Sequence, residues 1–187
     1  MPYSPIPELN LLHDFAEAHP YFSEGFEFYD FDRPDAGLVE WFDMKGDEPG
    51  VGVFLDGLMP FAQATGGGSF YALWRCDDRA DLATLPVVFF GDEGDLDVVG
   101  AGLRDLFRLL ALDDEMLGAA DGNDLSSDHH GDYVAWLAAT FGLTPPADPD
   151  ALIGMARAEH GEPFVEWLIA TVPTRLDLTD FRHGLGR

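Results

Sequence analysis

Three consecutive glycines, Gly66 to Gly68, are the first residues to suggest chemistry, because glycine-rich loops bind phosphate groups. Such a loop opens a helix whose N-terminal N–H groups face the phosphate, and it usually carries a Lys and a Ser or Thr. Here the glycines are followed by SFYALWR, a stretch typical of a strand, and by no lysine. We therefore expect a turn between two strands, where glycine readily takes a positive φ.

The sequence DHHGD, residues 128–132, is the one cluster with metal-ligand chemistry. Adjacent His129 and His130 point in different directions in most backbones, and a helical pair of ligands needs i, i+4 spacing. His13 and His160 are far away in the sequence. The nearby ADGNDLSSD lacks the glycine and the closing Glu of a calcium loop. We expect a polar loop near a helix start, and no bound metal.

Candidate nucleophiles are equally isolated. Cys76 follows a predicted strand, and nothing in the sequence assigns it a histidine partner. Ser69 lacks the GxSxG turn of the serine hydrolases. Carboxylates are abundant, but general acid–base work needs a pocket that separates two pKa values, and no spacing shows one. We expect no catalytic residues and no cofactor, so the protein should not be an enzyme.

The apolar patterns predict four strands. They are GFEFYDF (25–31), PGVGVFLDGLMPFAQ (49–63), SFYALWR (69–75) and LPVVFFG (85–91). The last is apolar on both faces, which favours a strand buried on both sides or capped by a helix, with Pro86 at its first residue.

Helical spacing predicts six helices. They are PELNLLHDFAEA (7–18), RPDAGLVEWFD (33–43), a helix from near Ala101 to Leu112, YVAWLAATFGL (133–143), DPDALIGMARAEHG (148–161) and EPFVEWLIATV (162–172). In the third, Val99 and Leu103 share the apolar face with Leu106. In the fifth, Asp148 is the expected N-cap and Gly161 the expected C-cap.

The long polar connection over residues 113–132 is the best candidate for a boundary. We expect a core over residues 1–118, followed by an acidic linker and a C-terminal helical extension over residues 119–187 that packs on the core.

Charge is the strongest signal in the composition. The chain of 187 residues has 35 acidic residues against 10 Lys plus Arg, a formal net charge of −25. Such a field repels nucleic acids and anionic lipids and attracts basic proteins. The single cysteine excludes an intrachain disulfide, and the N-terminal residues lack the pattern of a signal peptide. We expect a cytoplasmic protein that binds neither nucleic acid nor membrane.

Acidic residues also gather where local energetics do not favour them. GDEGDLD (91–97) places acids at a turn after a buried strand, and LDDE (112–115) places them at a helix C-terminus, against the helix dipole. We expect the following acids to be exposed and to bind a partner: Asp92, Glu93, Asp95, Asp113, Asp114 and Glu115. Leu58, Met59 and Leu96 lie in or near turns and are candidates for the apolar centre of that interface.

Taken in order, the central segments resemble the SUKH superfamily, in its SMI/KNR-like branch. The resemblance covers roughly residues 36–112. It rests on Phe61-Ala62 before the glycine turn, the aromatic strand 70–74, the PVV strand 86–90, the acidic turn 91–94 and the amphipathic helix 103–112. It implies an α+β fold, with a twisted, mainly antiparallel sheet packed against helices.

The resemblance also implies a function, since many bacterial members are immunity proteins of polymorphic toxin systems. They bind a cognate toxin domain, often one that acts on nucleic acids, and block it without chemistry. We therefore expect an immunity protein, monomeric or weakly dimeric, that neutralises a basic toxin domain by occlusion. The alternatives are a cytoplasmic scaffold or regulatory binding module unrelated to toxins and, third, an enzyme.

Overall fold

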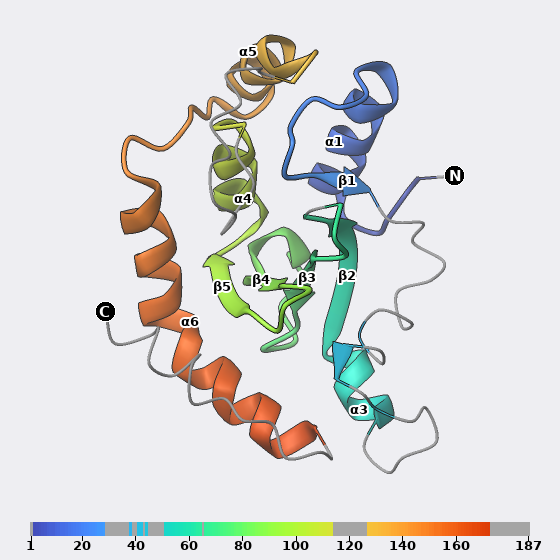
Figure 1. The fold of residues 1–187 in the computed structure, drawn as a ribbon, viewed down its shortest axis with the longest axis vertical. Coiled ribbons are helices and arrows are strands. Elements are labelled where there is room, and N and C mark those ends of the chain that lie inside the picture. Colours follow the sequence, from blue (N-terminus) through green and yellow to red (C-terminus); the bar gives the residue numbers. More distant parts are fainter. Residues whose placement is uncertain are drawn as a thin grey trace.

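The fold was obtained as a computed structural model (Figure 1), which describes residues 2–28, 38, 41, 42, 44, 51–64, 66–113 and 127–172. The elements are α1 (Pro7–Ala18), β1 (Glu27–Phe28), α3 (Val51–Asp56), β2 (Leu58–Gln63), β3 (Phe70–Trp74), the 3₁₀ turn η1 (Leu82–Thr84), β4 (Val87–Phe90), β5 (Leu96–Gly100), α4 (Leu103–Leu110), α5 (His130–Phe141) and α6 (Pro149–Thr171). The predicted helix over 33–43, apart from Leu38, Trp41 and Phe42, and the boundary at 118/119 lie outside the described residues.

The strands form one antiparallel sheet in the order β1-β2-β3-β4-β5, so each strand pairs with the one before it in the chain. The predicted α+β class, with a mainly antiparallel sheet packed against helices, is confirmed. The glycine run joins β2 to β3, as predicted, and Gly68 has a φ of 114°. This positive φ explains the glycine there, because side chains with a Cβ rarely adopt it.

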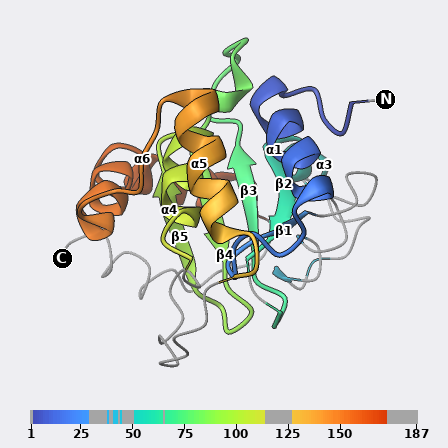
Figure 2. The ribbon, with the colours of Figure 1, turned by 90° about the horizontal axis from the view of Figure 1, so that it is seen from above.

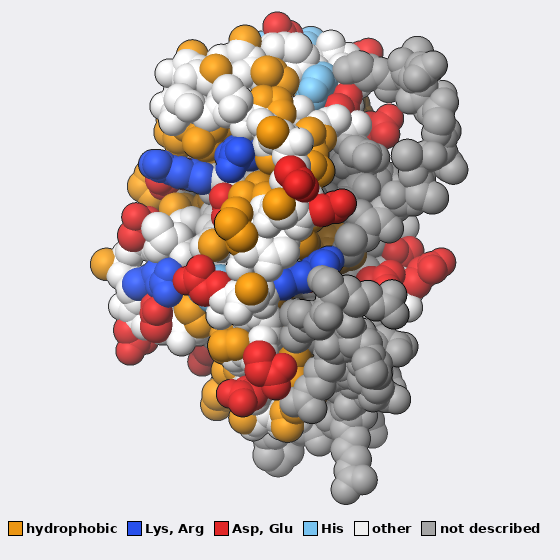
Figure 3. All heavy atoms as spheres, turned by 90° about the vertical axis from the view of Figure 1, so that its left-hand side faces the viewer, with side chains coloured by type: hydrophobic (Ala, Val, Ile, Leu, Met, Phe, Trp, Pro, Cys, Tyr) orange, Lys and Arg blue, Asp and Glu red, His pale blue; other side chains and the backbone are white. Residues whose placement is uncertain are grey.

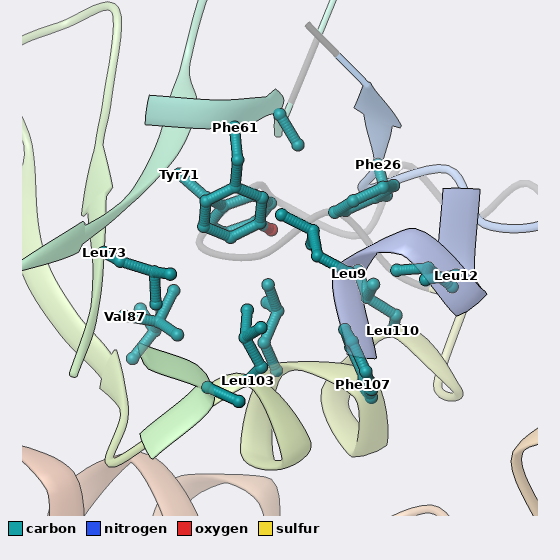
Figure 4. Packing of buried hydrophobic residues seen from close by; sticks show 14 of the residues in the cluster. Leu9, Leu12, Phe26, Phe61, Tyr71, Leu73, Val87, Leu103, Phe107 and Leu110 are labelled. Atoms are coloured by element: carbon teal, nitrogen blue, oxygen red, sulfur yellow. The ribbon is translucent and has the colours of Figure 1, made fainter. Parts of the chain in front are cut away.

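Helices cover both faces of the sheet (Figures 1 and 2). Alternate residues of β3 enter two separate cores: Tyr71 and Leu73 pack with α1, α4 and α5, whereas Phe70 and Trp74 pack with α3 and α6. Figure 4 shows the first core, where side chains of α1 point toward the sheet and those of α4 close the cluster. All four residues of β4 are buried, as expected for a strand that is apolar on both faces.

One predicted strand begins instead as a helix. Residues Val51–Asp56 form α3, and β2 begins only at Leu58. Val51 and Phe54 are buried three residues apart, while Val53 is 65% exposed. The ring of Phe54 stacks on Trp167 of α6 with 5.6 Å between centroids. The alternating valines suggested a strand, but this aromatic partner, more than 100 residues later, favours the helical spacing.

The predicted helix near Ala101 begins later than expected, because Val99 belongs to a fifth strand. Residues Leu96–Gly100 pair with β4, with Val98 opposite Val88. The helix then starts at Leu103. Gly102 permits this tight transition, since a Cβ there would lie 2.9 Å from the carbonyl oxygen of Ala83.

Two predicted C-terminal helices are one helix. α6 runs for 23 residues through both Gly161 and Pro163, so Gly161 is not a C-cap. A proline inside a helix removes one backbone hydrogen bond. Burial of Phe164 and Leu168 in the core with α3 offsets that cost. The predicted N-cap is confirmed, since Asp148 accepts a hydrogen bond from the backbone N–H of Ala151 at 2.9 Å.

Candidate functional site

The predicted acidic turn lies between β4 and β5. Gly91 closes it by donating its N–H to the carbonyl oxygen of Asp95 at 2.7 Å, and Gly94 has a φ of 95°. The side chains of Asp92, Glu93 and Asp95 are exposed, as expected. Their backbone is therefore fixed by the hairpin while their carboxylates are open to solvent.

The glycine turn lies beside the acidic turn and is bonded to it. The hydroxyl of Ser69 donates to Oδ1 of Asp92 at 2.7 Å and accepts the Asp92 backbone N–H at 3.1 Å. We call residues 66–69 and 91–95 together the acidic-turn surface. Neither Glu93 nor Asp95 has a basic partner among the described residues. Ser69 lies outside a GxSxG turn, and its role is structural, because its hydroxyl joins the glycine turn to the acidic turn.

Asp113, by contrast, is not an exposed acid. Only 7% of its side chain is accessible. Its carboxylate accepts the backbone N–H of Glu24 at 3.1 Å and both the N–H and the hydroxyl of Ser127 at 2.6 Å. Asp113 therefore joins the loop after α1 to the segment that starts α5. The expectation that it is exposed was wrong, because its partners lie 89 and 14 residues away.

Replacing Asp113 with asparagine should lower the free energy of unfolding by about 2 kcal/mol, because hydrogen bonds to a charged group contribute about 1.5–3 kcal/mol. Asparagine has a single acceptor oxygen, so one of the N–H donors would face an NH₂ group. Chemical denaturation measures the change. Asp128→Asn, at an exposed position in the same segment, is the control and should stay within about 0.5 kcal/mol of the parent. Equal stability of the two variants would show that the hydrogen bonds of Asp113 do not stabilise the fold.

Other residues predicted to form the interface are either buried or outside the described part of the chain. Asp114 and Glu115 lie outside the described residues. Leu58 is 3% and Leu96 is 9% exposed, so neither supplies an apolar centre to an interface. Both belong to the core with α3 and α6. Turn-like sequence around them suggested exposure, but the strands β2 and β5 begin at these residues.

The arginines of the described residues all have acceptors within the chain. Arg157 of α6 pairs through two nitrogens with Asp97 of β5, whose carboxylate is 6% exposed. The others are Arg75 with Met59, Arg79 with Asp77, Arg104 with Glu8, and Arg108 with the carbonyl oxygen of Thr144. Figure 3 shows the face over α5 and α6, where basic side chains are scattered among acidic and apolar ones. No pattern in the sequence pointed to the Asp97–Arg157 pair.

Shifted pKa values gather at the connection between β3 and β4. The hydrogen-bonded guanidinium of Arg79 lowers the pKa of Asp77 to about 2. Burial raises the pKa of the Cys76 thiol and lowers the pKa of His160. Shifted values can mark an active site, but a nucleophile needs a lowered thiol pKa or an adjacent base. Here the thiol is held in its protonated form, and Asp77 and Arg79 bond to each other.

Cys76 should consequently react with iodoacetamide at neutral pH more slowly than free cysteine, because the thiolate is the reacting species. The difference should disappear once guanidinium chloride unfolds the chain. Mass spectrometry of timed samples measures both rates. A folded-state rate above that of free cysteine would identify an activated thiol and contradict this interpretation.

One group of possible metal ligands was missed in the sequence. His13, Asp14 and Glu17 of α1 each offer a ligand atom, and these atoms lie within 4.8 Å of one another. The signal was present, because residues i and i+4 share a helix face. Asp14 and Glu17 are exposed and His13 is half-buried. Exposed carboxylates gather on many helices without binding an ion, so the group alone assigns no metal centre.

No family model, curated protein or solved structure matches the chain. The resemblance to the SUKH superfamily therefore stays a prediction from the sequence motifs. None of the described helices, α6 included, combines the length and the apolar character that a membrane span requires.

Proposed function

We propose that this chain is a SUKH-like immunity protein, which binds a basic toxin domain in the cytoplasm and blocks it by occlusion. The observation that carries the proposal is the net charge of −25, together with arginines that already have acceptors within the described part of the chain. Such a surface attracts a basic domain that acts on nucleic acids, and attraction of this kind speeds association by about 10–10³-fold.

The order of the elements supports the proposal. Phe61 and Ala62 lie in β2, the glycine turn follows, and the aromatic stretch and the PVV stretch become the neighbouring strands β3 and β4. The acidic turn comes next. One departure from the expected pattern is β5, which intervenes between that turn and the amphipathic helix α4.

The acidic-turn surface is the proposed contact. Its carboxylates project from the β4–β5 hairpin, which a hydrogen bond between Ser69 and Asp92 joins to the glycine turn, so binding would require little ordering of the backbone. The chain would act as a monomer or weak homodimer and would need no cofactor. Occlusion requires no chemistry from the immunity protein.

Co-expression tests the proposal. The toxin-like domain encoded beside this gene should stop bacterial growth when expressed alone, and co-expression of this chain should restore growth. An unrelated protein of similar size and net charge is the control for non-specific acidity. Toxicity that persists at equal expression would contradict the proposal and favour a binding module unrelated to toxins.

A further inference from the structure

A surface pocket of about 280 Å³ lies between α1, the loop that follows it, and β1. Its lining combines aromatic rings, among them Phe22 and Phe26, with Glu17 of α1 and with Glu27 of β1. Pockets for drug-sized ligands measure about 300–1,000 Å³. This pocket, near the lower end of that range, has room for one long side chain.

The carboxylates give the pocket its charge. Glu17 is exposed, and no basic side chain of the described residues pairs with it. Asp14 adds a second exposed carboxylate, and the carboxylates of the two lie within 4.8 Å of each other. The side chain of Glu27 points to the other face of β1, because Phe26 and Phe28 on either side of it both pack toward α1. A cation in the pocket would thus meet negative charge that the described part of the chain leaves without a counterion.

Stacked rings fix one wall of the pocket. The imidazole of His13 stacks on Tyr3 with 4.4 Å between centroids, and the ring of Phe28 meets both edge-on, at 5.0 Å from His13 and 4.8 Å from Tyr3. Tyr3 is held in turn, since its hydroxyl donates to the carbonyl oxygen of Phe61 at 2.8 Å. The aromatic surface is therefore preorganised.

Tyr21, which lines the pocket, has an unusual backbone. Its φ is 57°, a left-handed conformation that is uncommon for a residue with a bulky side chain, and the residue is 78% exposed. Strained backbone concentrates at binding sites, where the surrounding structure maintains it. An exposed ring beside an acidic, aromatic pocket can cover a bound cation.

We propose that this pocket receives the guanidinium group of an arginine from the partner protein. A guanidinium stacks on aromatic faces and donates hydrogen bonds to several carboxylates at once, which the more strongly hydrated lysine ammonium does less well. Arginine is also enriched among the residues that dominate interface energies. The role as a partner's anchor rests on the proposed function, whereas the guanidinium specificity is a property of this chain.

The pocket and the acidic-turn surface lie at the same end of the sheet. Glu27 is opposite Gln63, which is opposite Phe70, which is opposite Phe90 at the acidic turn. Three strand spacings separate β1 from β4, or about 14 Å. A partner of ordinary interface size can therefore contact both, with the acidic turn guiding it and the pocket anchoring it.

An NMR titration of the ¹⁵N-labelled chain with N-acetyl-arginine amide, in buffer containing EDTA, tests the specificity. We expect saturable shifts in the amides of residues 13–28. N-acetyl-citrulline amide, which has the same shape without the charge, should shift them far less. The double variant Asp14→Asn/Glu17→Gln should raise the Kd by about fivefold or more. Asp92→Asn/Glu93→Gln, an equal change of net charge on the acidic turn, should leave the Kd within about twofold.

Three outcomes would overturn the inference: no saturable shift in these amides, equal shifts with the citrulline probe, or equal weakening by the two double variants. A fourth is that zinc ions alone shift these amides while the arginine probe does not, which would make His13, Asp14 and Glu17 a metal site.

Binding of the toxin domain to pocket variants then tests whether the pocket anchors an arginine of the partner. Asp14→Asn/Glu17→Gln should raise the Kd for the toxin domain, mainly through faster dissociation. If the toxin binds this variant as tightly as the parent, the anchor is wrong while the proposed function stands. If the toxin binds no form of the chain, the proposed function fails, and the arginine titration still decides what the pocket binds.

Discussion

Replacing Arg157 with methionine is expected to lower the free energy of unfolding by about 3 kcal/mol, because removing one partner of a buried ion pair leaves an uncompensated charge. The remaining charge would be Asp97, whose carboxylate is 6% exposed within the sheet. Its two oxygens would lose both guanidinium hydrogen bonds. In a chain of this size, we expect Tm to fall by about 6–12 °C, which differential scanning calorimetry measures.

Two further variants make the result specific. Arg104→Met is the matched control, because this arginine is 61% exposed and 3.6 Å from Glu8, and surface pairs contribute about 0–1 kcal/mol. Asp97→Asn/Arg157→Met, which removes both charges, should recover part of the lost stability. If the double variant were less stable than Arg157→Met, a stranded carboxylate would not explain the loss.

Neutralising the acidic turn should slow association with the toxin domain about tenfold at low salt. The variant is Asp92→Asn/Glu93→Gln/Asp95→Asn. An asparagine in place of Asp92 would retain the oxygen that accepts from the Ser69 hydroxyl, so the two hairpins should stay joined. The effect should shrink at high salt, because exposed charges are then screened. Surface plasmon resonance at both salt concentrations measures the association rate constants.

A charge-matched control uses acids of α6 instead of the acidic turn. Asp150→Asn/Glu159→Gln/Glu166→Gln removes the same three charges from exposed positions of α6. We expect this variant to slow association far less, because steering depends on where the charge lies as well as on its sum. Equal effects of the two triple variants would mean that net charge alone guides the partner.

Local patterns predicted the elements whose partners are adjacent in the chain. The first helix, the strands β3 and β4, and the glycine turn between β2 and β3 appear as expected. Each combines a regular spacing of apolar residues with residues that mark its ends, as Asp148 and Pro149 mark the start of α6. The errors arose where a distant contact overrides the local pattern. Phe54 turns toward Trp167, and Val98 pairs with Val88.

In the candidate site too, local patterns predicted what depends on neighbouring residues and missed what depends on distant contacts. Asp92, Glu93 and Asp95 are exposed because a tight hairpin, visible in the glycine spacing, projects them. Asp113 is nearly buried because its donors come from Glu24 and Ser127, which its neighbours in the sequence do not reveal. The pocket was also missed, since it forms only when α1 lies beside β1.

Calorimetric titration of this chain with the toxin-like domain encoded nearest its gene, at low and at high salt, tests the proposed immunity function most directly. We expect tight one-to-one binding at low salt that weakens markedly at high salt, because acidic side chains would guide and hold a basic partner. Absence of binding at both salt concentrations would contradict immunity by occlusion, and the fold would then belong to a binding module with another partner.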